Sequence, residues 1–269
     1  MKFTIYLFFI GVVMQSCNSA NNSTETATTT AITTPTPLQY ELVKIYPHDT
    51  TAYTQGLEWD NNHLIEGTGL EGKSILHIMD TNMHTIGTKV NLDQSDFGEG
   101  TTLFKNKIYQ LTWKNHKVYV YDAKTLHKIN ELYWPYEGWG LTHNDTSLIV
   151  STGESNIYFV HPDNFAIQKT IGVYNNYGYV SNINELEFAN GLIWANIYGQ
   201  NDVILIDPNT GLVKHTINFA NLLSQSKVTI DPLTKDAGYV LNGIAYHPNR
   251  KTFFITGKCW PIMAEIKIK

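Results

Sequence analysis

A weak repeat runs through residues 39–269, and it constrains the fold more than any other feature of the sequence. Five segments share a layout of a polar residue, a glycine or its substitute, an apolar run, a turn and a second apolar run. Their anchor positions, which lie 44, 40, 45 and 58 residues apart, are Gly56, Gly100, Gly140, Glu185 and Gly243. The turns are rich in Asn, Asp, Gly and Pro, which suit tight reversals. Each segment is therefore predicted to be a pair of antiparallel strands.

The first four segments are each followed by a second pair of runs, so one unit holds four strands in about 40 to 45 residues, the period of a β-propeller blade. The fifth unit stops after a third strand, MAEIKIK, while LQYELVKIYP near the start resembles the missing fourth strand. Pairing of these two would close the ring and remove exposed edges. The sequence thus predicts an all-β, five-bladed β-propeller in which an N-terminal strand closes the last blade. A β-sandwich is the competing fold. In the longest interval, FANLLSQ is predicted to be a short helix.

The N-terminus has the pattern of a targeting segment. Lys2 precedes a 12-residue apolar run, too short to span a membrane but suited to a signal peptide. The run leads into MQSC, which resembles a bacterial lipobox, with an ordinary secretory signal as the alternative. We expect a signal peptide at 1–16, lipidation of Cys17, a Thr-rich tether at 17–38 and a propeller domain at 39–269. The protein would then be anchored by lipid in the bacterial cell envelope.

Charge and residue spacing exclude several classes of function. The net charge is −5 without a basic block, so nucleic acid is not an expected partner. The 10 histidines show no metal-binding spacing, and we expect neither a metal nor another cofactor. Cys259 is the only cysteine besides Cys17, which leaves no intrachain disulfide once Cys17 is lipidated.

The repeat register brings polar residues together. The first strand of each blade lines the channel of a propeller, so equivalent positions form a ring near one mouth. The residues immediately before the five anchors are Gln55, Glu99, Trp139, Asn184 and Asn242. A buried carboxylate among amides and an indole is costly and should be partnered or protonated. Glu99 is therefore the candidate proton-transfer group.

The second strands add large or charged residues toward the same region. Trp113 ends QLTW, Trp194 lies in LIWANIY, and Lys258 closes TGK. Packing in the core is the alternative for either tryptophan. A solvated surface position is the alternative for the lysine, which at the channel mouth would pair with Glu99 or meet a substrate carbonyl.

Several of these motifs together resemble one family. YTQGL, FGEGTTLF, GWGLT, INELE, LIWANI, LNGIAYHP and FFITGKCWP are similar, in order, to the plant and bacterial type of glutaminyl-peptide cyclotransferase. The resemblance covers nearly all of residues 39–269 and implies a five-bladed propeller. It also implies conversion of N-terminal glutaminyl residues to pyroglutamyl residues, with release of ammonia and without a metal. The positions that match the family's functional residues are Gln55, Glu99, Trp113, Trp139, Asn184, Trp194 and Lys258.

The resemblance implies an enzyme whose partners are peptides or proteins with N-terminal glutamine, and we expect a monomer. Glu99 would act as general acid and base, and the remaining matched residues would bind the substrate. The alternative is a non-catalytic propeller lipoprotein that binds a peptide or glycan, since fold alone does not fix function. An assembly scaffold is a third possibility. A binder has no need of Glu99, so this residue discriminates the first two.

Overall fold

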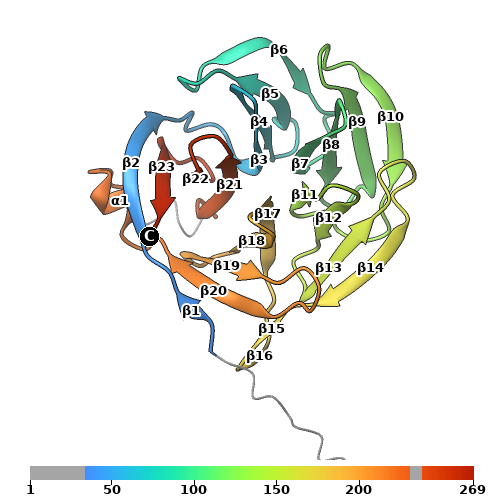
Figure 1. Cartoon of the computed structure of the whole chain (residues 1–269). Helices are drawn as coiled ribbons and strands as arrows, with labels where there is room; N and C mark the ends of the chain where they lie inside the picture. Colours follow the sequence, from blue (N-terminus) through green and yellow to red (C-terminus); the bar gives the residue numbers. More distant parts are fainter. Residues whose placement is uncertain (1–33, 231–237) are drawn as a thin grey trace, which may run out of the picture. The chain divides into compact units, whose positions relative to one another are not determined.

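The computed structural model describes residues 34–230 and 238–269. The predicted signal peptide, Cys17 and most of the tether lie outside the described residues. Five antiparallel sheets stand around a common axis and form the blades of one ring (Figure 1). The predicted five-bladed propeller is therefore confirmed. Within the two described ranges, we find no helix with both the length and the apolar character needed to cross a membrane.

Each of the first four blades runs in chain order from an inner strand at the axis to an outer strand at the rim. Blade 1 contains β3 (Thr54–Asp60), β4 (His63–Thr68), β5 (Ile75–Met79) and β6 (Thr85–Asn91). Blade 2 contains β7 (Gly98–Phe104), β8 (Lys107–Thr112), β9 (Lys117–Asp122) and β10 (Lys128–Tyr133). Blade 3 contains β11 (Leu141–His143), β12 (Leu148–Ser151), β13 (Asn156–Val160) and β14 (Ile167–Gly172). Blade 4 contains β17 (Ile183–Ala189), β18 (Leu192–Ile197), β19 (Asp202–Ile206) and β20 (Val213–Asn218).

The start of the chain closes blade 5. Its three C-terminal strands are β21 (Leu241–His247), β22 (Thr252–Gly257) and β23 (Ile262–Ile268). The fourth is β2 (Tyr40–Pro47), which pairs antiparallel with β23. This is the predicted closure, and Figure 1 shows β2 outside β23 at the rim.

Three smaller elements complete the fold. β1 (Thr36–Pro37) adds a fifth, parallel strand to blade 4 beside β20. These two residues belong to the expected tether, so the paired structure begins before the expected boundary at residue 39. A short hairpin, β15 (Tyr174–Asn175) with β16 (Gly178–Tyr179), precedes blade 4. The helix α1 (Leu222–Gln225) lies within the segment predicted to be helical.

The anchor positions matter because the inner strands approach one another closely. A Cβ atom at Gly56 would lie 2.2 Å from the backbone nitrogen of Thr101, and one at Gly140 would lie 2.0 Å from the carbonyl oxygen of Asn184. Such contacts exclude any side chain. In blade 4 the anchor is Glu185, whose buried carboxyl accepts hydrogen bonds from two backbone N–H groups of other blades, at 3.2 and 2.9 Å. The repeat seen in the sequence therefore follows from packing around the axis.

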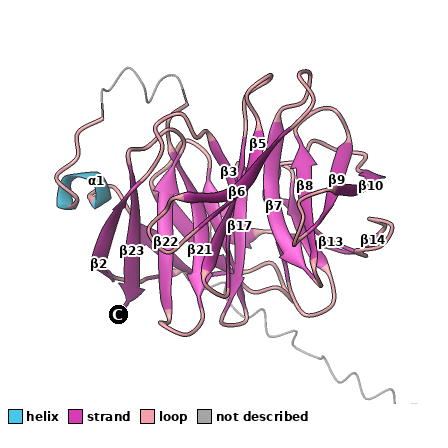
Figure 2. Cartoon of the chain, turned by 90° about the horizontal axis from the view of Figure 1, so that it is seen from above, coloured by secondary structure: helices cyan, strands magenta, loops and turns pink. Residues whose placement is uncertain are grey.

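Apolar side chains fill the junctions between blades. A separate cluster of buried residues lies at each of the five junctions, built from the facing sides of neighbouring sheets. Burying one aliphatic or aromatic side chain of this kind contributes about 1.5–3 kcal/mol. Figure 2 shows the blades side on, with the inner strands β3, β7, β17 and β21 running roughly parallel to the axis. These junctions hold the inner strands, and the residues at their ends, in a fixed arrangement.

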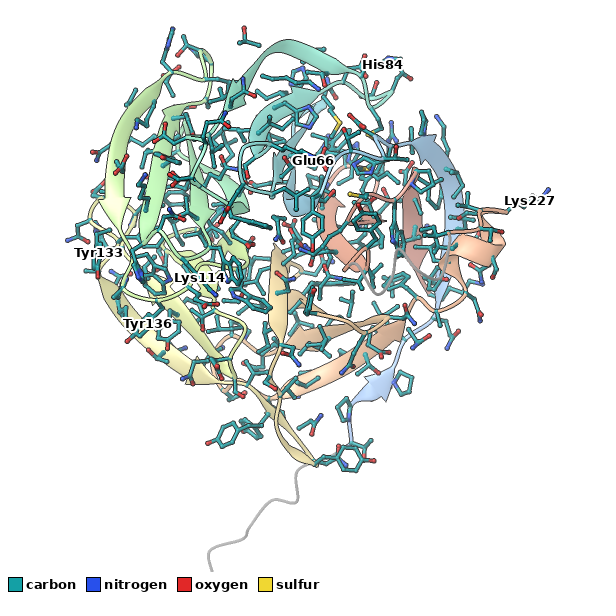
Figure 3. The ribbon with its side chains drawn as sticks, turned by 180° about the vertical axis from the view of Figure 1, so that it is seen from behind. Glu66, His84, Lys114, Tyr133, Tyr136 and Lys227 are labelled. Atoms are coloured by element: carbon teal, nitrogen blue, oxygen red, sulfur yellow. The ribbon has the colours of Figure 1, made fainter. Side chains whose placement is uncertain are left out.

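A buried polar network joins blade 1 to the chain entering it from blade 5. Glu66, in β4 and labelled in Figure 3, lies at the centre of this network. It accepts hydrogen bonds from His48 Nε2 at 3.0 Å and from His77 Nε2 at 2.8 Å. The other ring nitrogen of His48 lies 2.9 Å from the carbonyl oxygen of Trp260. Because both nitrogens of His48 face acceptors, its ring carries a proton on each and forms an ion pair with Glu66. Burial opposes this charge, but the charge of Glu66 and the hydrogen bonds to Glu66 and Trp260 together outweigh burial and raise the pKa of His48.

Candidate functional site

A cavity of about 240 Å³ opens where the inner strands begin. The inner strands β3, β7 and β17 begin at this face, and the second strands β8, β18 and β22 end at it. Residues at the starts of the inner strands and at the ends of the second strands therefore surround the axis. We call this opening the mouth. The cavity is lined by Tyr53, Gln55, Phe97, Glu99, Trp113, Trp139, Asn184, Tyr198 and Lys258. The structure thus brings together six of the seven residues that matched the family's functional positions; Trp194 is the exception.

Glu99 is the central acidic group of the cavity. It is 4% exposed and accepts a hydrogen bond from Gln55 Nε2 at 3.0 Å. Burial raises the pKa of Glu99 well above its usual range; the charge of Lys258 opposes that rise and the charge of Glu137 adds to it. A carboxyl whose pKa is raised by burial is suited to act as both a proton acceptor and a proton donor.

Gln55 has a defined orientation. Its Oε1 accepts hydrogen bonds from Lys258 Nζ and from Asn242 Nδ2, the latter at 3.3 Å. Both neighbours are donors, so the amide oxygen must face them and the amide nitrogen must face Glu99. Asn242, the fifth member of the expected ring, does not line the cavity and instead supports Gln55. In the described part of the chain, only one N–H of the Gln55 amide has a side-chain acceptor, which is Glu99.

Lys258 is a buried cation, 1% exposed, at the end of β22. Its Nζ lies 4.5 Å from the ring centre of Tyr53 and 5.8 Å from that of Tyr198. Burial lowers the pKa of Lys258 to about 8, although the nearby Glu99 acts in the opposite direction. The lysine contacts Glu99 through Gln55, which bonds to both.

Asn184 offers an unused acceptor. The residue is 2% exposed and lines the cavity, and its Oδ1 has no hydrogen-bond partner among the described residues. A buried amide oxygen without a partner costs free energy, typically about 1–3 kcal/mol. An N–H group of a bound ligand would remove that cost, so Asn184 is suited to bind one.

Aromatic rings form the walls. Phe97 packs edge-on against Trp113 with ring centres 5.6 Å apart, and Trp139 does the same with Tyr198 at 5.8 Å. A Cβ atom at Gly153, where φ is +78°, would lie 2.7 Å from the Trp139 ring, so glycine leaves the space that this indole occupies. The walls exclude water from the carboxyl and the amides, which strengthens the polar interactions inside.

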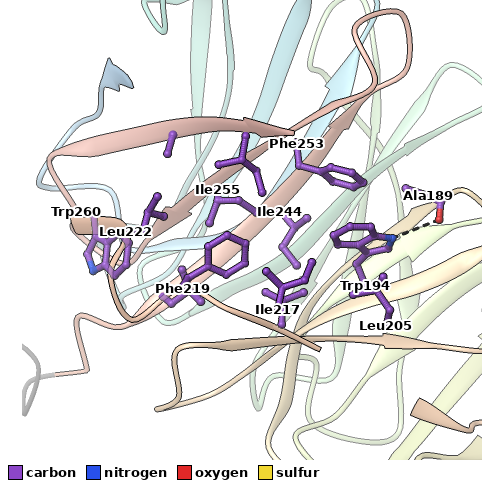
Figure 4. Packing of buried hydrophobic residues seen from close by; sticks show 14 residues of the cluster. Ala189, Trp194, Leu205, Ile217, Phe219, Leu222, Ile244, Phe253, Ile255 and Trp260 are labelled. Atoms are coloured by element: carbon purple, nitrogen blue, oxygen red, sulfur yellow. Dashed lines mark hydrogen bonds between the residues drawn. The ribbon is translucent and has the colours of Figure 1, made fainter. Parts of the chain in front are cut away.

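Trp194 does not reach the cavity, which corrects the expectation that it would wall the site. It is 3% exposed in the cluster between blades 4 and 5, where it stacks on Phe253 and donates a hydrogen bond to the carbonyl oxygen of Ala189 at 3.3 Å (Figure 4). Trp194 lies near the start of β18, at the far end of the strand from the mouth. The residue that follows β18 at the mouth is Tyr198, which is in the cavity wall.

Three wall residues were not predicted from the sequence: Tyr53, Phe97 and Tyr198. The position of each of these residues relative to the strands of its blade could have indicated it. In blades 2, 4 and 5, the N–H of the residue after the second strand (Trp113, Tyr198 or Lys258) bonds to the carbonyl group just before the first strand. Extending the register from Trp113 and Lys258 to blade 4 selects Tyr198. Tyr53 and Phe97 each stand two positions before a ring residue.

No metal-binding cluster was found in the described ranges, where three or more His, Cys, Asp or Glu side chains nowhere converge suitably for a metal ion. The polar groups of the cavity include one carboxyl, two amides, one amine and the hydroxyls of Tyr53 and Tyr198, which suit hydrogen bonding and proton transfer.

The fold and the cavity together define the class of protein. It is a five-bladed propeller with a buried carboxyl and a buried amine in the cavity at the mouth. Comparison with known proteins gives the family. The sequence profile of the glutamine cyclotransferase family matches residues 12–268. The chain belongs to this family.

Two relatives agree with this assignment. A glutaminyl-peptide cyclotransferase of Arabidopsis thaliana is 32% identical over 237 residues, which cover 86% of this chain and 72% of the relative. The crystal structure of Myxococcus xanthus glutaminyl cyclase superposes with a TM-score of 0.78 at 31% identity, covering 87% of this chain and 98% of that one. The chain is thus a homologue of glutaminyl-peptide cyclotransferase.

Proposed function

We propose that the protein converts N-terminal glutaminyl residues of peptides and proteins to pyroglutamyl residues and releases ammonia. Family membership supports the reaction, and the observation that carries it is the buried Glu99 carboxyl, bonded to Gln55 inside an aromatic cavity. A cavity of about 240 Å³ has room for one terminal residue rather than a folded segment. The rest of the substrate would extend out of the mouth.

In the proposed reaction, the α-amine of the substrate attacks the carbon of its own γ-carboxamide. A carbon–nitrogen bond forms to close the ring, and the bond to the amide nitrogen breaks. Attack within one molecule already has favourable proximity. Glu99 accepts the proton that the attacking amine loses and passes it to the departing nitrogen, which leaves as ammonia. Acid–base help of this kind is typically worth about 10² to 10⁴ in rate.

The amides and the lysine have supporting roles in this proposal. The second N–H of Gln55 would stabilise the carboxamide oxygen as negative charge develops, and the hydrogen bond from Lys258 supports this orientation of the Gln55 amide. Asn184 Oδ1 accepts an N–H of the substrate. The tryptophans Trp113 and Trp139 shield the amine from water, which favours its neutral, nucleophilic form.

An ammonia-release assay with a Gln-initiated dipeptide tests the function. Wild-type protein should release ammonia, and Glu99→Gln should lose about 10²-fold or more of the rate. Glu154→Gln, an equivalent change at an exposed position near the mouth, is the control and should keep the rate. Full activity in Glu99→Gln would refute the role of Glu99. Peptide binding without ammonia release by the wild type would favour the non-catalytic binder.

Metal independence is part of the proposal, because the mechanism uses only protein groups. Prolonged incubation with EDTA or phenanthroline, followed by removal of the chelator, should leave the rate unchanged. Loss of activity that a specific divalent metal restores would contradict this mechanism.

We also propose that the protein is a lipid-anchored monomer of the bacterial cell envelope, modified at Cys17. The support is the lipobox-like MQSC and the Thr-rich stretch after it. Mass spectrometry of the mature N-terminus should find a diacylglyceryl group on Cys17, and Cys17→Ser should abolish the modification and release the protein from membranes. Sedimentation in detergent would measure the oligomeric state.

A further inference from the structure

The carboxylate of Glu137 joins two walls of the cavity. Its Oε2 accepts a hydrogen bond from the indole N–H of Trp113 at 2.7 Å and from that of Trp139 at 3.2 Å. Trp113 follows β8 of blade 2, whereas Trp139 precedes β11 of blade 3. A single oxygen atom therefore fixes two aromatic rings that belong to different blades.

Lys114 completes the arrangement at the rim of the mouth. Its Nζ lies 3.7 Å from Glu137 Oε1 and 3.8 Å from the ring centre of Trp113. Figure 3 shows Lys114 closer to the centre of the ring of blades than Tyr133 and Tyr136. The carboxylate is thus contacted by two indoles and an ammonium, and it cannot turn without losing one of them.

These bonds determine what the tryptophans can offer a substrate. Both indole N–H groups are engaged by Glu137, so each ring contributes hydrophobic surface to the cavity rather than a donor. The other four indole N–H groups of the protein, those of Trp59, Trp134, Trp194 and Trp260, donate to backbone carbonyl oxygens. The Trp113 and Trp139 pair is distinct because a side-chain charge holds it.

We propose that Glu137 is a positioning residue for the cyclisation: it fixes Trp113 and Trp139 as the walls that hold the substrate against Glu99, and it keeps a negative charge beside that group. This inference rests on the proposed function. The charged groups that act on Glu99 are Lys258 and Glu137, and the phenol of Tyr53 is also close enough to interact with it. The charge of Glu137 raises the pKa of Glu99, behind burial and against Lys258.

The kinetic test compares Glu137→Gln and Glu137→Leu with Glu154→Gln. Loss of the fixed walls should lower kcat/KM of Glu137→Leu at least tenfold on a Gln-initiated dipeptide. In Glu137→Gln, removal of the negative charge should move the limb of the kcat–pH profile that reports Glu99 to lower pH, which loss of packing alone would not do. Glu154→Gln should match the wild type in both. Unchanged profiles in both Glu137 variants, with an active wild type, would overturn the inference.

A second readout does not depend on activity. In ¹H–¹⁵N spectra of the whole protein, Glu137→Gln should shift the indole N–H signals of Trp113 and Trp139. The Trp134 signal should remain, because Trp134 donates to the backbone oxygen of residue 137, which the substitution keeps. If the wild type releases no ammonia, the proposed function fails while these shifts still report the contact. Six unmoved signals would refute the contact itself.

Discussion

At the scale of single residues, Glu99 and Lys258 are two groups whose charges burial disfavours. Among the residues that the structure describes, neither group forms a direct salt bridge, and Gln55 connects them. Active sites often retain such groups at the expense of stability. Replacing the Glu99 carboxyl with a neutral group should therefore lower the activity and raise the stability of the fold.

We expect Glu99→Gln to be more stable than the wild type at pH 8. Because folding raises the pKa of Glu99, its contribution to stability is present below the unfolded value of about 4.3 and is lost as pH rises toward the folded value. The amide has no such loss. Thermal melts should show a higher Tm for the variant at pH 8 and a smaller difference at pH 4, with about 2–4 °C per kcal/mol for a chain of this size. A lower Tm for Glu99→Gln than for the wild type at pH 8 would show that the buried carboxyl does not destabilise the fold.

The titration of Lys258 should make kcat fall at alkaline pH. Its pKa is about 8, so above that pH it loses the charge that holds Gln55 in place. We expect kcat of the wild type to fall above pH about 8. Lys258→Met should be slow at all pH values and lack this limb, while Lys128→Met, on an outer strand, should keep it. A wild-type kcat that stays level to pH 10 would show that the lysine charge is not needed.

At the scale of elements, the seam between blades 1 and 5 depends on the His48–Glu66 pair. Both side chains are almost fully buried, at 1% and 0% exposure. Removing one partner of a buried pair leaves the other without compensation, which typically costs about 3–5 kcal/mol. The raised pKa of His48 means that its contribution is lost at high pH, and the lowered pKa of Glu66 means that its contribution is lost in acid.

We therefore expect Glu66→Gln to lower the free energy of unfolding by about 3 kcal/mol or more in urea titrations at pH 6. The loss should shrink as pH rises through the pKa of His48. His84→Gln removes a largely exposed pair with Asp80 in the same blade and should change the stability little. If the two substitutions lowered the free energy of unfolding equally, the buried pair would not be what stabilises the contact between blades 1 and 5.

The repeat register was sufficient to predict the blades, because close approach of the inner strands dictates the anchor residues. It also placed Gln55, Glu99 and Asn184, which come directly before those anchors. Trp194 was predicted from its residue type, whereas strand length places Tyr198, directly after the same strand, in the cavity wall. The contact of Glu137 with Trp113 and Trp139 was beyond prediction from local pattern, because it depends on indoles of two blades meeting in space. The β1 pairing was missed because two residues in a polar stretch carry no alternation.

At the scale of the whole molecule, closure by β2 holds the ring together. β2 pairs along most of β23, and its side chains Leu42, Ile45 and Tyr46 pack on clusters at two junctions. Deletion of residues 1–33 should leave Tm unchanged, whereas deletion of residues 1–47 should expose the β23 edge and give insoluble or unfolded protein. Soluble yield and thermal melts of the two truncations would measure this, and a folded 48–269 fragment would show that closure is dispensable.

The direction of the first and last strands has a practical consequence. β20 runs toward the mouth, and β1 is parallel to it, so the chain enters the propeller from the opposite face. β23 runs away from the mouth, and the C-terminus in Figure 2 lies at that same opposite face. Either end can therefore be joined to a resin, an electrode or a fusion partner while the entrance to the cavity stays turned toward the solution.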